Sequence, residues 1–165
     1  MELKIHPLTA ADFAPFGEVI ELAGAKNFPI NDGLTTRFHD LCTIDTLDQG
    51  GKTIVNIFRT SPLSLPHRVN KMERHPLGSQ AFLPTDKLPF LVLVGKAKPE
   101  LSPEDLMLFI TNGEQGINLH KNTWHHFQIG TQGERDFIVI DRGGSGHNLQ
   151  EIHIKGEAIV PKPDL

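Results

Sequence analysis

Short apolar stretches, each bounded by glycine or proline, recur along the whole chain. Stretches of this length that are rich in β-branched and aromatic side chains and end at turn residues are typical of strands. About ten such segments with almost no helix between them favour a closed or sandwich-like β fold. The pattern predicts strands over residues 18–22, 53–60, 67–75, 79–83, 90–94, 106–111, 116–120, 125–129, 135–141 and 151–154.

Helix signals occur in only two places. Thr9 can accept a hydrogen bond at the start of a short helix over residues 10–14, which Pro15 ends. Ser102 can cap a single turn that has Pro103 in its first position. The predicted fold class is therefore all-β with a few short helices.

The composition is ordinary, with 38% hydrophobic and 22% charged residues, and predicts a single domain over residues 1–165 with a frayed tail over 160–165. A formal net charge of -4 gives no basic surface for nucleic acid or acidic membranes. The single cysteine, Cys42, cannot form an internal disulfide, and no apolar run approaches the ~20 residues of a membrane helix. We therefore expect a cytoplasmic protein without nucleic-acid or membrane partners.

The stretch MERHPLGSQAF, residues 72–82, places a carboxylate and an imidazole two positions apart. Residues i and i+2 of a strand point to the same face, so Glu73 and His75 are expected to project together. A turn at residues 76–78 can bring Gln80 back beside them. These groups inside a barrel could bind a divalent metal of borderline hardness. The alternative is a hydrogen-bonded Glu–His pair that caps a turn.

A second polar cluster, INLHKNTWHHF, spans residues 117–127. Adjacent strand residues face opposite sides, so only one of His125 and His126 is expected to point inward. A turn at residues 121–123 would let His120 share the interior with His125, whereas a continuous strand would pair His120 with His126. Periodicity leaves both alternatives open. Two histidine-bearing segments together indicate a metal site more strongly than either segment alone.

Arginines form a third group of candidates. Arg59 ends one predicted strand and Arg142 follows another, and a guanidinium at a barrel mouth suits bidentate binding of a small carboxylate. The segment NDGLTTRFHDL, residues 31–41, could fold over the mouth as a loop, although its chemistry alone favours a hairpin connection. No phosphate-binding glycine loop or nucleophile-elbow serine is present.

Three separated motifs resemble the ureidoglycolate lyase family, formerly called ureidoglycolate hydrolases. They are MERHPLGSQAFLP, FITNGEQGINLHKNTWHH and DFIVIDRGGSG, and the opening PLTAADFAPFGEVIE is similar as well. The resemblance implies a cupin, a small antiparallel β-barrel, which agrees with the strand pattern. It also implies an enzyme of allantoin (purine) degradation that splits ureidoglycolate into glyoxylate and urea, and a homodimer.

Within the cupin superfamily, the resemblance places Glu73, His75, Gln80 and His125 at the positions of the metal motifs. Here a glutamate replaces one of the usual histidines, and a glutamine replaces the usual acid. The resemblance implies a divalent metal, nickel (Ni²⁺) in particular, on Glu73, His75 and His125. A Zn²⁺ or Mn²⁺ ion and metal-free catalysis are the alternatives.

The resemblance also suggests roles for the polar residues. Glu73 is expected to act as a general base or metal ligand, with His75 and His125 as ligands or proton carriers. His120 is the leading general acid. The groups expected to bind substrate are Gln80, Asn122, Arg59 and Arg142. The runner-up functions are a non-catalytic cupin that binds a small acid and another metal-dependent cupin enzyme.

Overall fold

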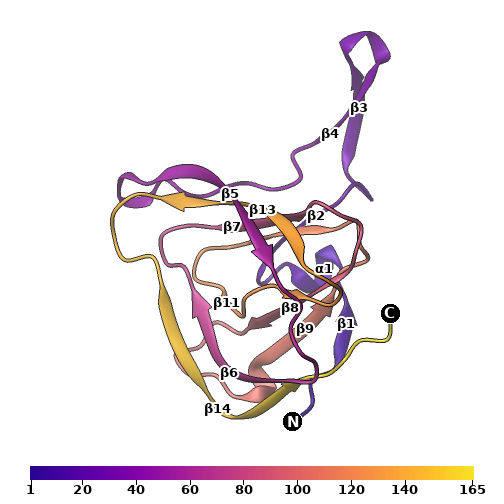
Figure 1. The fold of residues 1–165 in the computed structure, drawn as a ribbon. Coiled ribbons are helices and arrows are strands. Elements are labelled where there is room, and N and C mark those ends of the chain that lie inside the picture. The colour runs from indigo at the N-terminus through magenta and orange to yellow at the C-terminus, as the bar shows by residue number, and fades with distance from the viewer.

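Strands with alternating inward and outward side chains organise the chain into two curled β-sheets that face each other and form an open barrel (Figure 1). The computed structural model describes residues 1–165. The larger sheet has the order β1-β9-β8-β11-β6-β14, with β12 beside β8. Its strands are β1 (Ile5–Pro7), β6 (His67–Arg74), β8 (Phe90–Gly95), β9 (Leu106–Ile110), β11 (Trp124–His125), β12 (Ile129–Gly130) and β14 (Gln150–Val160).

The smaller sheet has the order β2-β10-β7-β13-β5. All of its neighbouring strands are antiparallel, and the longest ladder joins β13 to β5. Its strands are β2 (Gly17–Ile20), β5 (Lys52–Thr60), β7 (Gln80–Pro84), β10 (Gly116–Leu119) and β13 (Arg135–Gly143).

Nine of the ten predicted strands are present as single strands, and the all-β class is confirmed. The segment predicted as one strand over residues 125–129 is wrong as a single element, because β11 ends at His125 and β12 begins only at Ile129. Strand β1 was not predicted, since three residues are too few to show an alternating pattern. It pairs parallel with β9, so the barrel is mixed rather than purely antiparallel.

The apolar side chains form two cores. One lies between the sheets and contains the inward-facing residues of β8, β7 and β13, among them Val94, Phe82 and Val139. The other lies on the opposite face of the larger sheet and includes Trp124 and Met72. Because strand side chains alternate, β11 sends Trp124 into the outer core and His125 into the barrel.

The short helices begin where the sequence predicts. Helix α1 (Ala10–Phe13) has Thr9 as its N-cap, and the Thr9 hydroxyl accepts a hydrogen bond from the backbone N–H of Asp12. The 3₁₀ turn η3 (Pro103–Asp105) carries a capping box with Ser102. Two further 3₁₀ turns are η1 (Asn31–Gly33) and η2 (Asp48–Gly50). None of the helices has the length and apolar character required to span a bilayer.

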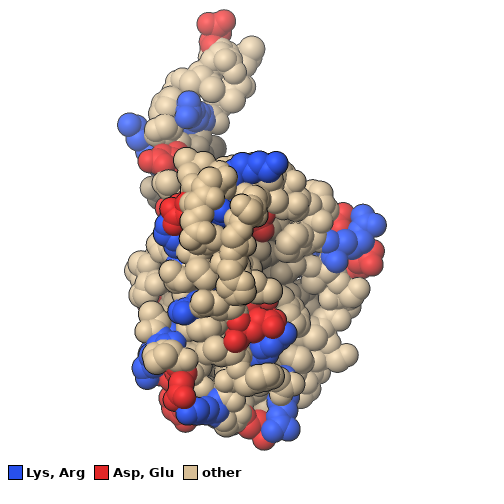
Figure 2. Space-filling view, turned by 90° about the vertical axis from the view of Figure 1, so that its left-hand side faces the viewer, with Lys and Arg blue, Asp and Glu red and all other residues tan.

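A two-stranded arm, β3 (Lys26–Ile30) and β4 (Thr35–His39), projects away from the barrel (Figure 1). The hairpin predicted for this segment is confirmed, and it does not fold over the barrel mouth. Leu34 at its tip is 89% exposed, and charged side chains lie along it (Figure 2). A lone two-stranded ribbon has little stability of its own in water, so we expect a partner to cover the arm.

Candidate active site and metal centre

Glu73 and His125 meet because the ends of β6 and β11 pair directly. The two residues are Cα partners in the antiparallel ladder, and His125 is also the partner of Val94 in β8. Val94 belongs to the core between the sheets, so this register turns both polar side chains toward the barrel interior. His75 lies just beyond the end of β6 and completes the group.

The ligand atoms of Glu73, His75 and His125 all lie within 4.8 Å of one another. The two imidazole centroids are 5.1 Å apart, and His125 Nε2 is 3.5 Å from Glu73 Oε1. The sequence prediction that these three residues converge is therefore confirmed as geometry. One carboxylate and two imidazoles form a donor set suited to Ni²⁺, Zn²⁺ and similar divalent ions.

Backbone carbonyls fix the orientation of both imidazoles. His75 Nδ1 lies 2.8 Å from the Asn148 carbonyl, and His125 Nδ1 lies 2.9 Å from the Thr123 carbonyl. Because a carbonyl can only accept, each Nδ1 donates, which leaves Nε2 as the ring nitrogen that faces the interior. Both Nε2 atoms are buried and have no hydrogen-bond partner. Two such nitrogens beside a carboxylate fit a divalent cation, and metal-binding histidines usually have their other ring nitrogen held by a carbonyl or carboxylate in this way.

The protonation states also suit a metal. The neighbouring His125 lowers the pKa of the Glu73 carboxyl, although burial opposes this shift. Burial is the main cause that lowers the pKa of His75, and the charge on His125 acts in the same direction. Glu73 is therefore ionised and His75 neutral near pH 7, which are the forms that bind a metal.

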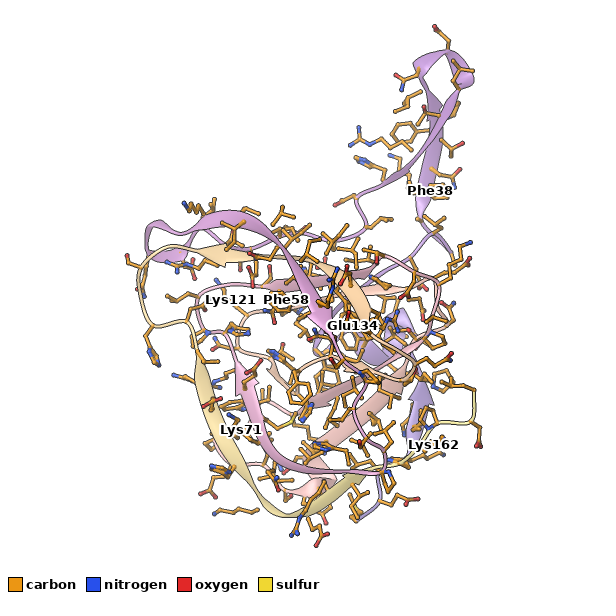
Figure 3. The ribbon with its side chains drawn as sticks, viewed as in Figure 1. Phe38, Phe58, Lys71, Lys121, Glu134 and Lys162 are labelled. Atoms are coloured by element: carbon orange, nitrogen blue, oxygen red, sulfur yellow. The ribbon has the colours of Figure 1, made fainter.

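A cavity of about 210 Å³ adjoins this group and is lined by Glu73, His125, His126 and Phe127, among others. The prediction that only one of His125 and His126 faces inward is wrong, because β11 ends at His125 and strand alternation no longer governs the next residue. Burial lowers the pKa of His126 to about 4. Lys71 of β6, labelled in Figure 3, also lines this cavity.

Gln80 enters the barrel from β7, where it pairs with Leu119 of the inner core. Its Nε2 donates to Asp141 Oδ2 at 3.1 Å, and Asn56 Nδ2 donates to Asp141 Oδ1 at 3.0 Å. The sequence analysis did not single out Asp141 or Asn56. Strand alternation could have identified Asp141, because it occupies the same inward face of β13 as Val139.

His120 and Asn122 lie outside this group. His120 is half-exposed, and its Nε2 lies 3.8 Å from Glu18 Oε2, away from His125. A turn does separate β10 from β11, but His120 falls one residue after Leu119, whose side chain faces inward. Asn122 has a positive φ of 66° and uses its backbone N–H to donate to the His75 carbonyl. Its exposed side chain makes no hydrogen bond.

Neither predicted arginine is free at the triad. Arg59 is exposed on β5 and donates two hydrogen bonds to Asp136. Arg142 is buried, and its guanidinium donates to the backbone carbonyls of Asp48, Gln49 and Ser145. Both guanidiniums therefore have protein partners. Lys71, the basic side chain that lines the cavity beside Glu73, also has one, because its ammonium group donates to Glu151.

Comparison with known proteins places this arrangement in a family. The family model described as ureidoglycolate lyase matches residues 1–161. The chain belongs to the ureidoglycolate lyase family. Among its relatives named ureidoglycolate lyase, one from Burkholderia mallei (strain NCTC 10229) is 53% identical, with 90% of this chain and 87% of the relative covered. One from Pseudomonas aeruginosa (strain LESB58) is 47% identical, with 90% and 88% covered. Another, from Pseudomonas putida (strain W619), is 44% identical, with 96% and 95% covered.

Membership in the ureidoglycolate lyase family confirms the resemblance stated from the sequence motifs. The matched residues 1–161 include the projecting arm, both sheets and every residue of the triad. The family match therefore extends over the framework as well as the polar interior.

Proposed function

We propose that this protein is a ureidoglycolate lyase, a carbon–nitrogen lyase that splits ureidoglycolate into glyoxylate and urea in allantoin degradation. The observation that carries the proposal is the convergence of half-buried Glu73 and His75 with buried His125 in a chain that belongs to this family. The proposal includes a cytoplasmic location for the protein.

The reaction needs a proton moved between two atoms on one carbon. Ureidoglycolate carries a carboxylate, a hydroxyl and a ureido nitrogen on that carbon. Removing the hydroxyl proton lets the oxygen form the aldehyde carbonyl of glyoxylate while the C–N bond breaks. The departing urea nitrogen must gain a proton, because urea anion is a very poor leaving group. General acid–base groups typically contribute about 10²- to 10⁴-fold to such steps.

Glu73 is the group that suits this proton transfer. It is ionised near neutral pH and faces the interior, so one carboxylate oxygen can take the hydroxyl proton. Because the hydroxyl and the nitrogen share a carbon, the same carboxyl can then return the proton to the leaving urea nitrogen. Lys71 lines the adjoining cavity and replaces Arg59 and Arg142 in this proposal as the partner of the substrate carboxylate, which would compete with Glu151 for the Lys71 ammonium group.

Glu73, His75 and His125 would also hold the divalent metal, through one carboxylate oxygen and the two Nε2 atoms. A metal in this position supplies a Lewis acid that lowers the pKa of the substrate hydroxyl. Nickel is our first choice from the family resemblance, with Zn²⁺ and Mn²⁺ as alternatives that the same donor set accepts.

Product analysis tests the proposal. Racemic ureidoglycolate is incubated with the purified, untagged protein, and glyoxylate, urea and ammonia are each measured. Equal release of glyoxylate and urea is the expected result. Release of ammonia in place of urea would replace the proposal with a ureidohydrolase-type reaction, and binding without any product would support a small-acid-binding cupin.

Metal analysis of the same preparation tests the cofactor. We expect about one divalent ion per chain, loss of activity on chelation, and recovery when Ni²⁺ is returned. Full activity after the metal has been removed would support metal-free catalysis instead.

We also propose a homodimer, because the chain has two uncovered surfaces that two copies could bury against each other. The outer face of the smaller sheet exposes Val55, Ile57 and Ile138, which are 67%, 59% and 36% exposed, and Ile57 pairs directly with Ile138. The projecting arm also has no partner within its own chain. In a two-fold pair, the arm of each copy would cover the apolar face of the other.

A further inference from the structure

Asp141 fixes which way two amide groups point. An ionised carboxylate only accepts hydrogen bonds, so the Gln80 and Asn56 side chains must turn their NH₂ groups toward it. Each amide oxygen then lies on the opposite side of its group. Neither Gln80 Oε1 nor Asn56 Oδ1 accepts a hydrogen bond from the protein. Neither oxygen is fully buried, so both are accessible. Two acceptors are thus held ready for a ligand.

These acceptors share the barrel interior with the metal triad. Gln80 and Asp141 both occupy inward positions of the smaller sheet, beside Leu119 and Val139 of the inner core. The negative charge of Asp141 also reaches His75, where it opposes the burial that lowers the pKa of that histidine.

Asn56 stands on the same face of β5 as Phe58, which is labelled in Figure 3 and packs edge-on to Phe82 with centroids 6.1 Å apart. The two sides of the interior differ in chemistry. One side offers ligands for a cation, and the other offers hydrogen-bond acceptors.

The chemistry of the acceptors indicates what they recognise. A ureido group carries N–H donors on both nitrogens, whereas glyoxylate and the hydroxy-acid part of the substrate carry none on nitrogen. We propose that Gln80 and Asn56 accept hydrogen bonds from the ureido N–H groups, and that Asp141 is the positioning residue that holds both amides in the accepting orientation. This inference rests on the proposed lyase function and adds the subsite that distinguishes a ureido compound from other α-hydroxy acids.

Replacing Asp141 by asparagine should release this constraint. An amide at position 141 both donates and accepts, so either orientation of Gln80 and Asn56 becomes possible. A site built to bond an N–H group loses affinity when its acceptors turn away. The variant should bind the ureido end of the ligand more weakly and the carboxylate end with unchanged affinity.

The two reaction products separate these ends. Product inhibition by urea and by glyoxylate is measured on the wild type and on Asp141→Asn. We expect the inhibition constant of urea and the KM of ureidoglycolate to rise about tenfold, an effect of about one hydrogen bond, while the inhibition constant of glyoxylate changes less than about twofold. Asp136→Asn is the matched control, since it makes the same change on the outer face of the same strand, and both constants should stay at the wild-type values.

A second variant guards against a folding defect. Gln80→Met keeps the length of the side chain and removes the amide oxygen, and it should weaken urea but not glyoxylate in the same way. Parallel changes in both inhibition constants, or no change in either, would overturn the inference. If the wild type shows no turnover, the proposed function fails separately, and direct binding of urea to the wild type and to Asp141→Asn, measured by ligand-observed NMR, still decides the subsite.

Discussion

At Arg142, an experiment can distinguish most clearly between a structural role and a substrate-binding role. Its Nε and Nη2 atoms donate to the Asp48 carbonyl at 3.0 and 2.8 Å, and Nη2 also donates to the Ser145 carbonyl at 2.8 Å. Gly51 and Gly78 leave room for its stem, since a Cβ at Gly51 would lie 2.3 Å from Arg142 Nε. The guanidinium therefore joins the loop that precedes β5 to the loop that follows β13.

Arg142→Met keeps the apolar stem and removes every donor. Each hydrogen bond to a charged group contributes about 1.5–3 kcal/mol. The Arg142 side chain is only 7% exposed, and its removal leaves two carbonyls without their charged donors. At the lower figure, we expect the free energy of unfolding to fall by about 3 kcal/mol. For a chain of this size, such a loss lowers Tm by about 6–12 °C.

Guanidinium chloride unfolding, followed by the fluorescence of the single tryptophan, measures this effect. Trp124 is buried and reports on the core of the larger sheet. Arg59→Met is the control, because Arg59 is exposed and its ion pair with Asp136 is screened by solvent, so its unfolding midpoint should stay close to that of the wild type. An Arg142→Met protein of unchanged stability with a greatly raised KM would refute the structural role and restore Arg142 as the carboxylate-binding group.

Three other predictions concern acid stability, catalysis and assembly. The Lys98 side chain, together with Ser102, lowers the pKa of Asp105 to about 2 from 3.8, so its stabilising effect is present above pH 3.8 and is lost as the pH falls toward 2. The difference in unfolding midpoint between wild type and Asp105→Asn should therefore shrink over this range, and a constant difference would contradict the assignment. Glu73→Gln should lower kcat by about 10²- to 10⁴-fold with unfolding unchanged, and near-normal turnover would remove Glu73 from the mechanism. Ile57→Asp should convert a dimer to a monomer in light scattering, and an unchanged mass would exclude this sheet face as the interface.

Strand alternation predicts the framework of the site because it decides which side chains share the interior. Glu73 and His75 are two residues apart at the end of a strand, and the structure brings them together as that spacing predicts. The same rule, applied to the strand DFIVID, places Asp141 on the inner face with Phe137 and Val139. The rule therefore reaches further than the residues to which the sequence analysis applied it.

His126 and Arg142 mark where alternation stops being informative. His126 follows the last residue of β11, so no pleat decides the direction of its side chain. The carbonyls that receive Arg142 come from residues 48, 49 and 145, and their positions depend on the paths of two loops. An arginine at a strand end looks the same in sequence whether it meets a substrate or the backbone of its own protein.

The pairing of β6 with β11 gives the metal group a thermodynamic consequence. Glu73 and His125 are far apart in the chain and become neighbours only when these two strands join, so the unfolded polypeptide offers no equivalent cluster. Any cation held there binds the native state alone and resists unfolding by mass action. Each tenfold rise in the free concentration of such a cation above Kd would then add about 1.4 kcal/mol, and the melting temperature would rise with it.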